Sequence, residues 1–349
     1  MFRAAIISFL VPFTSCILST RGEVAFDWVT VGNPGNQSDS TGFGDVTYTY
    51  RISKYEVTNT QYTNFLNSVD SNGENLLALY NPNMTTEGAG GILFDSNQPP
   101  GMKYVVKPNY GEYPVVFVSF LDSMRFVNWL ENNQGSGDTE TGVYTISDGL
   151  SEVRSQSASY FIPSENEWYK AAYHKNDGNT GNYWDYPTST DTEPYSDDPT
   201  SLNSPDNSNV ANFIKDDGIA NGYNDFFAIP GPNNSTANHL SEVGAYSLAF
   251  SPYGTFDQGG NVREWTDTIY DSNQRVVRGG GWDEASFTLL ASTRGSGEPS
   301  SENSGANGFR IASAIPEPST IILVLICNSL NMLRVRQRRD WYHCNNHSK

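Results

Sequence analysis

One short turn contains the residues whose types and spacing most clearly suit a chemical role. Asp257 and Glu264 flank a pair of glycines, Gly259 and Gly260, in the stretch DQGGNVRE. Carboxylate oxygens, together with main-chain carbonyls that a glycine turn leaves free, are the ligands that Ca²⁺ prefers. The pattern therefore indicates a hard-cation site, although an N-cap or an ion pair with the neighbouring Arg263 would use the same residue types.

Other chemistry-bearing residue types give weaker signals. His174 and His239 are far apart along the chain and show no helical ligand spacing, which favours hydrogen-bonded or solvated histidines over a metal pair. The run Gly279–Gly281 has no lysine or hydroxyl residue at phosphate-loop spacing, so it favours a turn. No nucleophile-elbow sequence is present. We therefore predict no catalytic residue from motifs alone.

Cysteine usage and charge exclude several classes of function. The three cysteines are Cys16, Cys327 and Cys344, and none lies between residues 26 and 313. That segment therefore cannot hold a disulfide or a thiolate metal site. The formal net charge is −18, which argues against nucleic acid as a partner. Excess carboxylates favour solubility or an interaction with divalent cations.

Three segments carry the signature of a helix start. In a capping box, a hydroxyl side chain and a polar side chain three residues later satisfy each other's free amides. Such boxes begin at Thr58, Ser119 and Ser164, and apolar residues at helical spacing follow each one. The sequence therefore predicts three capped amphipathic helices.

Alternating polarity indicates the strands. Residues 47–57 place Tyr48, Tyr50 and Ile52 on one side, as a half-buried strand does. Two further strand candidates, 275–278 and 308–312, close the domain.

Two long stretches are polar and rich in turn residues. Residues 132–159 and 176–209 contain too few apolar side chains to form cores of their own. We expect them to be loops packed on one α+β domain with little regular structure for its length. No internal repeat is present.

Five separated regions of the chain carry residue patterns that can be compared with known families. They are KYEVTNTQYTNFL (54–66), YPVVFVSFLDSMRFVNWL (113–130), FIPSENEWYKAAY (161–173), SPYGTFDQGGNVREW (251–265), and RGGGW (278–282) with GFRIA (308–312). Their order is the one used by formylglycine-generating (sulfatase-modifying factor) domains, and the segment 26–313 resembles that family. The resemblance implies an α+β fold that is a loop-rich, C-type-lectin-like variant with sparse secondary structure.

The same resemblance implies structural calcium ions. At the first calcium site, the family's ligands correspond to the side chains of Asp257 and Glu264 and to the carbonyls of Gly260 and Val262. The resemblance also implies a second calcium site elsewhere in the chain, with the ligands Asn212, Phe213, Asp225 and Phe227.

Family enzymes oxidise a sulfatase cysteine by means of copper held between two cysteines that follow the RGGSW-type strand. By alignment those two positions are Glu284 and Leu289 here. A carboxylate is a hard ligand and leucine is no ligand, so a soft Cu(I) site is not expected. The resemblance therefore implies the scaffold of the family without its copper chemistry.

The ends of the chain differ from its middle. Arg3 precedes an interrupted apolar run, 4–18, which predicts a signal peptide over 1–25. Residues 314–349 contain Pro-Glu-Pro, an apolar segment and an arginine cluster, and resemble a bacterial PEP-CTERM sorting tail. That resemblance implies exosortase-type processing at the cell envelope, and membrane contact only through the tail. A simple membrane anchor would predict the same compartment.

These observations leave three hypotheses for an exported protein of the cell envelope, surface or matrix. The first is a non-catalytic, calcium-stabilised module that binds a glycan, peptide or matrix component. The second is a formylglycine-generating oxidase, and the third is a structural component of an exopolysaccharide matrix. Aromatic side chains in loops can stack on sugars, and the candidates are Tyr183, Trp184, Tyr186, Tyr195 and Trp282.

Overall fold

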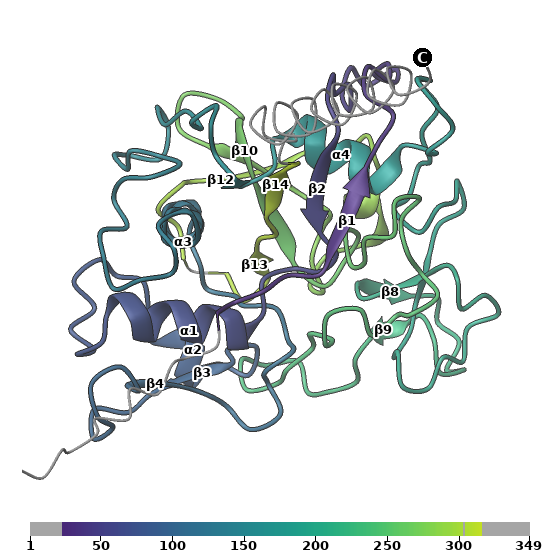
Figure 1. Cartoon of the computed structure of the whole chain (residues 1–349). Coiled ribbons are helices and arrows are strands. Elements are labelled where there is room, and N and C mark those ends of the chain that lie inside the picture. The colour runs from purple at the N-terminus through teal and green to yellow at the C-terminus, as the bar shows by residue number, and fades with distance from the viewer. Residues whose placement is uncertain (1–22, 303, 316–349) are drawn as a thin grey trace, which may run out of the picture.

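The computed structural model describes residues 23–302 and 304–315 (Figure 1). Almost all of the predicted signal peptide and sorting tail therefore lies outside the described residues. Within the described part of the chain, no helix combines the length and the apolar character needed to cross a membrane.

The three predicted helices begin at the three predicted caps. In each case the cap hydroxyl accepts the amide of the third helical residue, whose side chain accepts the cap amide in return. This reciprocal pairing stabilises a helix start because both amides would otherwise lack partners. The helices are α1 (Asn59–Val69), α3 (Phe120–Glu131) and α4 (Glu165–Tyr173), and two shorter ones are α2 (Asn83–Thr86) and a 3-10 turn, η1 (Ser286–Leu289).

A four-stranded antiparallel sheet joins both ends of the domain. Its order is β1-β2-β14-β5, and Ile52 of β2 pairs with Ala312 of β14. The strand predicted over 47–57 is shorter than expected, because β1 and β14 supply ladder partners only from Tyr50 onward. The strands are β1 (Trp28–Val31), β2 (Tyr50–Ser53), β14 (Ala312–Ala314) and β5 (Tyr160–Phe161).

A second sheet has the order β12-β11-β10-β13. β11 has the bounds predicted for it, whereas the strand predicted over 308–312 is split into β13 and β14. The intervening residues 309–311 pass from one sheet to the other, and the carbonyl of Ile311 accepts the Ser53 amide at 2.8 Å. The strands are β10 (Arg263–Ile269), β11 (Arg275–Arg278), β12 (Gly295–Gly297) and β13 (Asn307–Gly308).

Three small two-stranded sheets lie outside these two. β3 pairs with β4 and β8 with β9 as antiparallel hairpins, while β6 and β7 are parallel. In Figure 1 the β8–β9 hairpin lies on the far side of the domain from the β3–β4 hairpin. The strands are β3 (Ile92–Phe94), β4 (Tyr104–Val106), β6 (Tyr195–Ser196), β7 (Val210–Ala211), β8 (Ile214–Asp216) and β9 (Asp225–Phe227).

The main core also anchors the first long loop. Aromatic rings centred on Phe126 of α3, including Tyr62 and Phe65 of α1, form the main buried cluster. The loop at 132–159 packs on this core through Val143 and Tyr144, as predicted, and polar side chains also hold it. Asn128 donates to two of its carbonyls at 2.7 and 2.9 Å, and Glu152 accepts three of its amides.

Candidate functional site

A fully buried ion pair lies at the centre of the candidate site. Arg310, in the segment that crosses between the sheets, donates through Nε and Nη2 to the two carboxylate oxygens of Glu264 at 2.6 Å each. Trp168 of α4 also donates its indole N–H to Glu264, at 2.7 Å. All three side chains are almost completely excluded from solvent. A buried charge requires such a partner, because desolvation would otherwise cost several kcal/mol.

Two more carboxylates surround this pair. Asp257 accepts the Gly244 amide at 2.6 Å, and Glu56 accepts the Asn261 side chain at 3.1 Å. Burial raises the pKa of Asp257 to about 6. Burial, followed by the repulsion of Asp257, raises the pKa of Glu56 well above its usual range. The other oxygen of Glu56, Oε2, is buried and has no hydrogen-bond partner among the described residues.

The glycine turn is packed tightly against Asn212. Gly260 adopts φ +83°, and a Cβ at this position would come within 2.3 Å of the Asn212 carbonyl oxygen. Only glycine is compatible with this approach. The Asn261 amide donates to the same carbonyl at 2.8 Å, and the Asn261 side chain also contacts Asn212 and Ser241. The structure thus brings the turn of the first predicted site beside Asn212 of the second.

The predicted calcium ligands of the first site differ in their surroundings. Both oxygens of Glu264 are engaged by Arg310, so this side chain serves as an ion-pair partner. Asp257 and Glu56 are less fully compensated, and their oxygens fit a hard cation. Within the described residues, no three His, Cys, Asp or Glu side chains converge as a metal site. A cation would therefore also need main-chain oxygens, such as the predicted carbonyls of Gly260 and Val262.

The ligands predicted for the second site are spread along the β8–β9 hairpin. Asn212 has a buried side-chain oxygen without a hydrogen-bond partner among the described residues, and the carbonyl of Phe213 accepts the Ser196 hydroxyl at 2.5 Å. Phe227 pairs with Ile214, but Asp225 pairs with Asp216 and lies at the far end of the hairpin. Asn212, which precedes β8, and Asp225 therefore lie toward opposite ends of the hairpin, and their joint coordination of a cation stays a prediction.

The two positions that align with copper-binding cysteines have structural contacts of their own. Glu284 accepts the Gly281 amide and an Arg263 guanidinium N–H, both at 3.1 Å. Leu289 is fully buried in a small cluster with Tyr186 and Phe213. Neither residue supplies a soft ligand, so the residues present do not fit copper.

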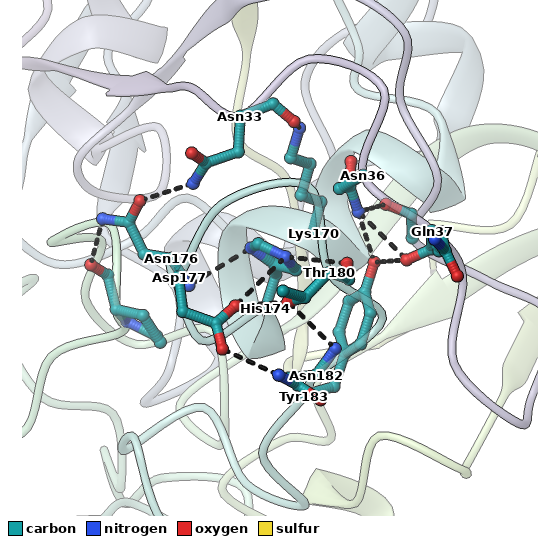
Figure 2. Close-up of polar contacts among 12 residues, drawn as sticks. Asn33, Asn36, Gln37, Lys170, His174, Asn176, Asp177, Thr180, Asn182 and Tyr183 are labelled. Carbon is teal, nitrogen blue, oxygen red and sulfur yellow. Dashed lines mark hydrogen bonds and ion pairs between the residues drawn. The ribbon is translucent and has the colours of Figure 1, made fainter.

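The two histidines of the described domain lie in separate hydrogen-bonded settings, as predicted. His174 Nδ1 is 2.8 Å from the Tyr253 hydroxyl. It is also 3.2 Å from the Asn176 amide (Figure 2). Because an amide N–H only donates, Nδ1 is the acceptor and Nε2 carries the proton, which it donates to the Thr180 carbonyl. Burial lowers the pKa of His174. His239 instead contacts the Ile229 carbonyl through Nδ1 at 2.8 Å and packs in a cluster with the rings of Phe227 and Trp282.

Sequence reasoning missed several buried charges, among them Glu56, Lys170 and Arg310. Lys170 is fully buried, and its ammonium group donates to the Asn33 carbonyl at 2.9 Å (Figure 2). Burial lowers the pKa of Lys170 to about 8. The sequence does contain one indication that Arg310 is buried and paired. The residue lies between Phe309 and Ile311 in an otherwise apolar run, and a charge buried there requires a partner.

Comparisons with solved structures find similar chains at low sequence identity. CarF matches with a TM-score of 0.49 and 19% identity, over 84% of this chain and 99% of CarF. Variable protein 1 of Treponema denticola matches with a TM-score of 0.49 and 18% identity, over 84% and 97% of the two chains. PvdO of Pseudomonas aeruginosa matches with a TM-score of 0.40 and 17% identity, over 83% and 92%.

Family membership rests on the sequence itself. No curated protein matches the chain. The model of the sulfatase-modifying factor enzyme 1-like domain, however, matches residues 30–315, which is most of the chain and includes all five regions on which the resemblance rests. The α+β, loop-rich architecture agrees with that assignment. The chain therefore belongs to the family of sulfatase-modifying factor enzyme 1-like (FGE-sulfatase) domains.

Proposed function

We propose that this protein is an exported, non-catalytic member of its family that serves as a binding module at the cell surface. The observation that carries the proposal is the state of the two aligned cysteine positions. Glu284 is held by Arg263 and by the Gly281 amide, and Leu289 is part of an apolar cluster. Neither position provides the thiolate that copper-dependent oxidation requires.

Export and surface display are supported by the two ends of the sequence. The predicted signal peptide, 1–25, directs the chain across the membrane. The tail, 314–349, has the layout of a PEP-CTERM signal, so an exosortase-type enzyme is the proposed processing partner. The domain between them carries no cysteine and needs no disulfide chemistry after export. An extracellular glycan, peptide or matrix component is the proposed ligand.

Structural calcium is part of the same proposal. Glu56, Asp257 and Glu264 place three carboxylates around the single guanidinium of Arg310, and Glu56 Oε2 has no partner among the described residues. A hard cation beside Asp257 and Glu56 would offset the excess negative charge. Its contribution would be stability rather than chemistry.

An oxidation assay tests the absence of catalysis. The purified full chain is incubated with Cu(I), oxygen and a cysteine-containing sulfatase peptide, and an enzyme that retains both cysteines serves as the positive control. We expect no aldehyde product by mass spectrometry and no retained copper after gel filtration. Formation of the aldehyde by this chain would overturn the proposal and support the oxidase hypothesis instead.

A further inference from the structure

A groove of about 360 Å³ lies beside the β8–β9 hairpin, away from the buried carboxylates. One side is formed by the residues of β9 and its preceding turn, the other by the loop at 230–233, and Ser196 and Asp197 also line it. The hairpin lies among the loops on the right of Figure 1. Asp225, Phe226 and Asn233 are exposed, so the groove opens to solvent. Two of its residues, Asp225 and Phe227, are also ligands of the second predicted calcium site.

Aromatic rings form much of one wall, and each is held by a neighbour. Phe226 is 41% exposed, and its ring lies 4.6 Å from that of Phe227. Phe227 stacks on His239 at 3.9 Å, and His239 stacks on Trp282 at 5.1 Å. Phe227 also contacts Trp282 directly, at 5.8 Å. This three-ring cluster fixes the wall before any ligand arrives, which reduces the entropy cost of binding.

Tyr223 is the second aromatic residue of the groove. Its ring meets Tyr195 edge to face at 5.4 Å. Tyr195 and Trp282 were two of the aromatic contacts predicted from the sequence, and both support groove residues from behind. Of the other predicted contacts, Tyr186 is buried and Trp184 is covered by the Lys175 ammonium group, 3.7 Å from its ring centre.

The polar side chains of the groove are carboxylates, hydroxyls and a neutral amide. Asp225 is exposed and uses one carboxylate oxygen to accept the Gly222 amide at 2.9 Å. Asn233 is an exposed amide on the opposite side. No lysine or arginine lines the groove, and Asp197 and Asp225 make it acidic. Sulfated or uronic acid ligands would therefore be repelled.

The backbone holds Phe226 in an unusual conformation. Phe226 has φ +87° and Asn224 has φ +53°, a region that a phenylalanine rarely occupies and that costs about 1–3 kcal/mol. Asn224 is fixed by two hydrogen bonds to the main chain of Ser196, at 2.6 and 2.9 Å. The anchored hairpin thus maintains an exposed ring at a strained position, where glycine would fold more easily.

We infer that this groove binds a neutral saccharide. A pyranose has an apolar face that stacks on an aromatic ring and hydroxyls that donate to carboxylate and amide oxygens. Phe226 and Tyr223 supply the rings, and Asp225 and Asn233 supply the polar partners. The inference rests on the proposed function as a surface binding module, and it specifies the ligand class and the place where the ligand binds.

Calorimetric titration of the purified full chain tests the inference. The neutral probes are cellohexaose, xylohexaose and mannohexaose. Polygalacturonate tests for binding of an anionic polymer, and a tyrosine-rich peptide tests for binding of a polypeptide. We expect at least one neutral oligosaccharide to bind. Phe226→Ala should weaken its binding at least tenfold. Phe94→Ala is the matched control, because Phe94 is 39% exposed on the β3–β4 hairpin, and it should leave binding unchanged.

A second variant separates binding from folding. Phe226→Gly removes the ring and also suits the left-handed backbone, so its melting temperature should be unchanged or higher while saccharide binding is lost. The inference is overturned if no neutral oligosaccharide binds, if polygalacturonate or the peptide binds instead, or if both Phe226 variants bind normally. Those results leave the non-catalytic assignment in place, which only the aldehyde assay overturns.

Discussion

Arg310 and Glu264 are 46 residues apart in the chain and form a bidentate ion pair with no solvent contact on either side chain. The guanidinium also donates to the carbonyls of Ser53 and Phe256, at 3.1 and 2.8 Å. One side chain therefore links the crossing segment to β2, to β10 and to the loop before the glycine turn. Its removal affects all of these connections together.

We predict that Arg310→Met destabilises the domain by about 3–5 kcal/mol, because Glu264 would remain buried without its partner. Urea unfolding followed by tryptophan fluorescence measures the effect. The control is Arg125→Met, whose partner Glu140 is 37% exposed, and for which a loss of only about 1 kcal/mol is expected. Similar losses in the two variants would contradict the central role of the Arg310 pair.

Calcium removal should lower the melting temperature of the domain. A chelator is expected to destabilise the protein, and Ca²⁺ but not Mg²⁺ should restore it, since Mg²⁺ demands a stricter octahedral geometry. At a hundredfold excess over Kd, a single ion contributes about 2.7 kcal/mol. Differential scanning fluorimetry provides the measurement.

Two matched variants assign the calcium effect to a site. Asp257→Asn should abolish the difference between chelator and Ca²⁺ if the ion binds at the glycine turn. Asp225→Asn should do so only if the hairpin site is the one occupied. Identical melting curves with and without chelator in the unaltered protein would show that no calcium ion stabilises the domain.

Asp122 should make the domain less stable as the pH rises. Burial, followed by repulsion from Glu302, raises the pKa of this α3 carboxyl to about 7. The folded state then holds its proton more tightly than the unfolded chain, so stability is greatest below the unfolded pKa and decreases as the pH rises through about 7. Asp122→Asn should flatten the unfolding free energy between pH 5 and 8.

The control for Asp122 is Asp138→Asn. Asp138 is exposed, and its hydrogen bond from the Thr141 hydroxyl lowers its pKa. It is therefore ionised throughout the pH 5 to 8 window, and its substitution should leave the slope unchanged. An Asp122→Asn variant that keeps the full slope would show that another group is responsible.

Lys170 should have the opposite pH dependence. Burial lowers its pKa to about 8, below the value in an unfolded chain, so the folded state releases its proton first. Stability should then rise between pH 8 and about 10 as the charge is lost. Lys170→Met should remove this rise and should not weaken the domain at pH 7. A large loss of stability at pH 7 would mean that the bond to Asn33 outweighs the cost of the buried charge.

The helix starts could be predicted because their determinants are local. Thr58, Ser119 and Ser164 each find their partner three residues away, within the reach of a sequence pattern. The strand predicted over 308–312 shows the limit of this approach. Its division into β13 and β14 depends on partners in β10 and β2, which are distant in sequence.

The candidate site shows the same division. The glycine turn and the loss of the family's cysteines were visible in the sequence, because each is defined by residue types at known positions. The pairing of Glu264 with Arg310 was not, since only folding brings the two together. The spread of Asn212 and Asp225 along one hairpin likewise depends on a register that neither residue reveals alone.

The position of β14 has a consequence for biogenesis. This strand lies inside the first sheet, between β2 and β5, yet its residues are synthesised after nearly all the rest of the domain. The sheet cannot close while the ribosome is still adding residues 312–314, and Arg310 reaches its partner no earlier. A nascent chain whose sheet stays incomplete until its last strand emerges remains unfolded for longer, which suits the export proposed for this protein.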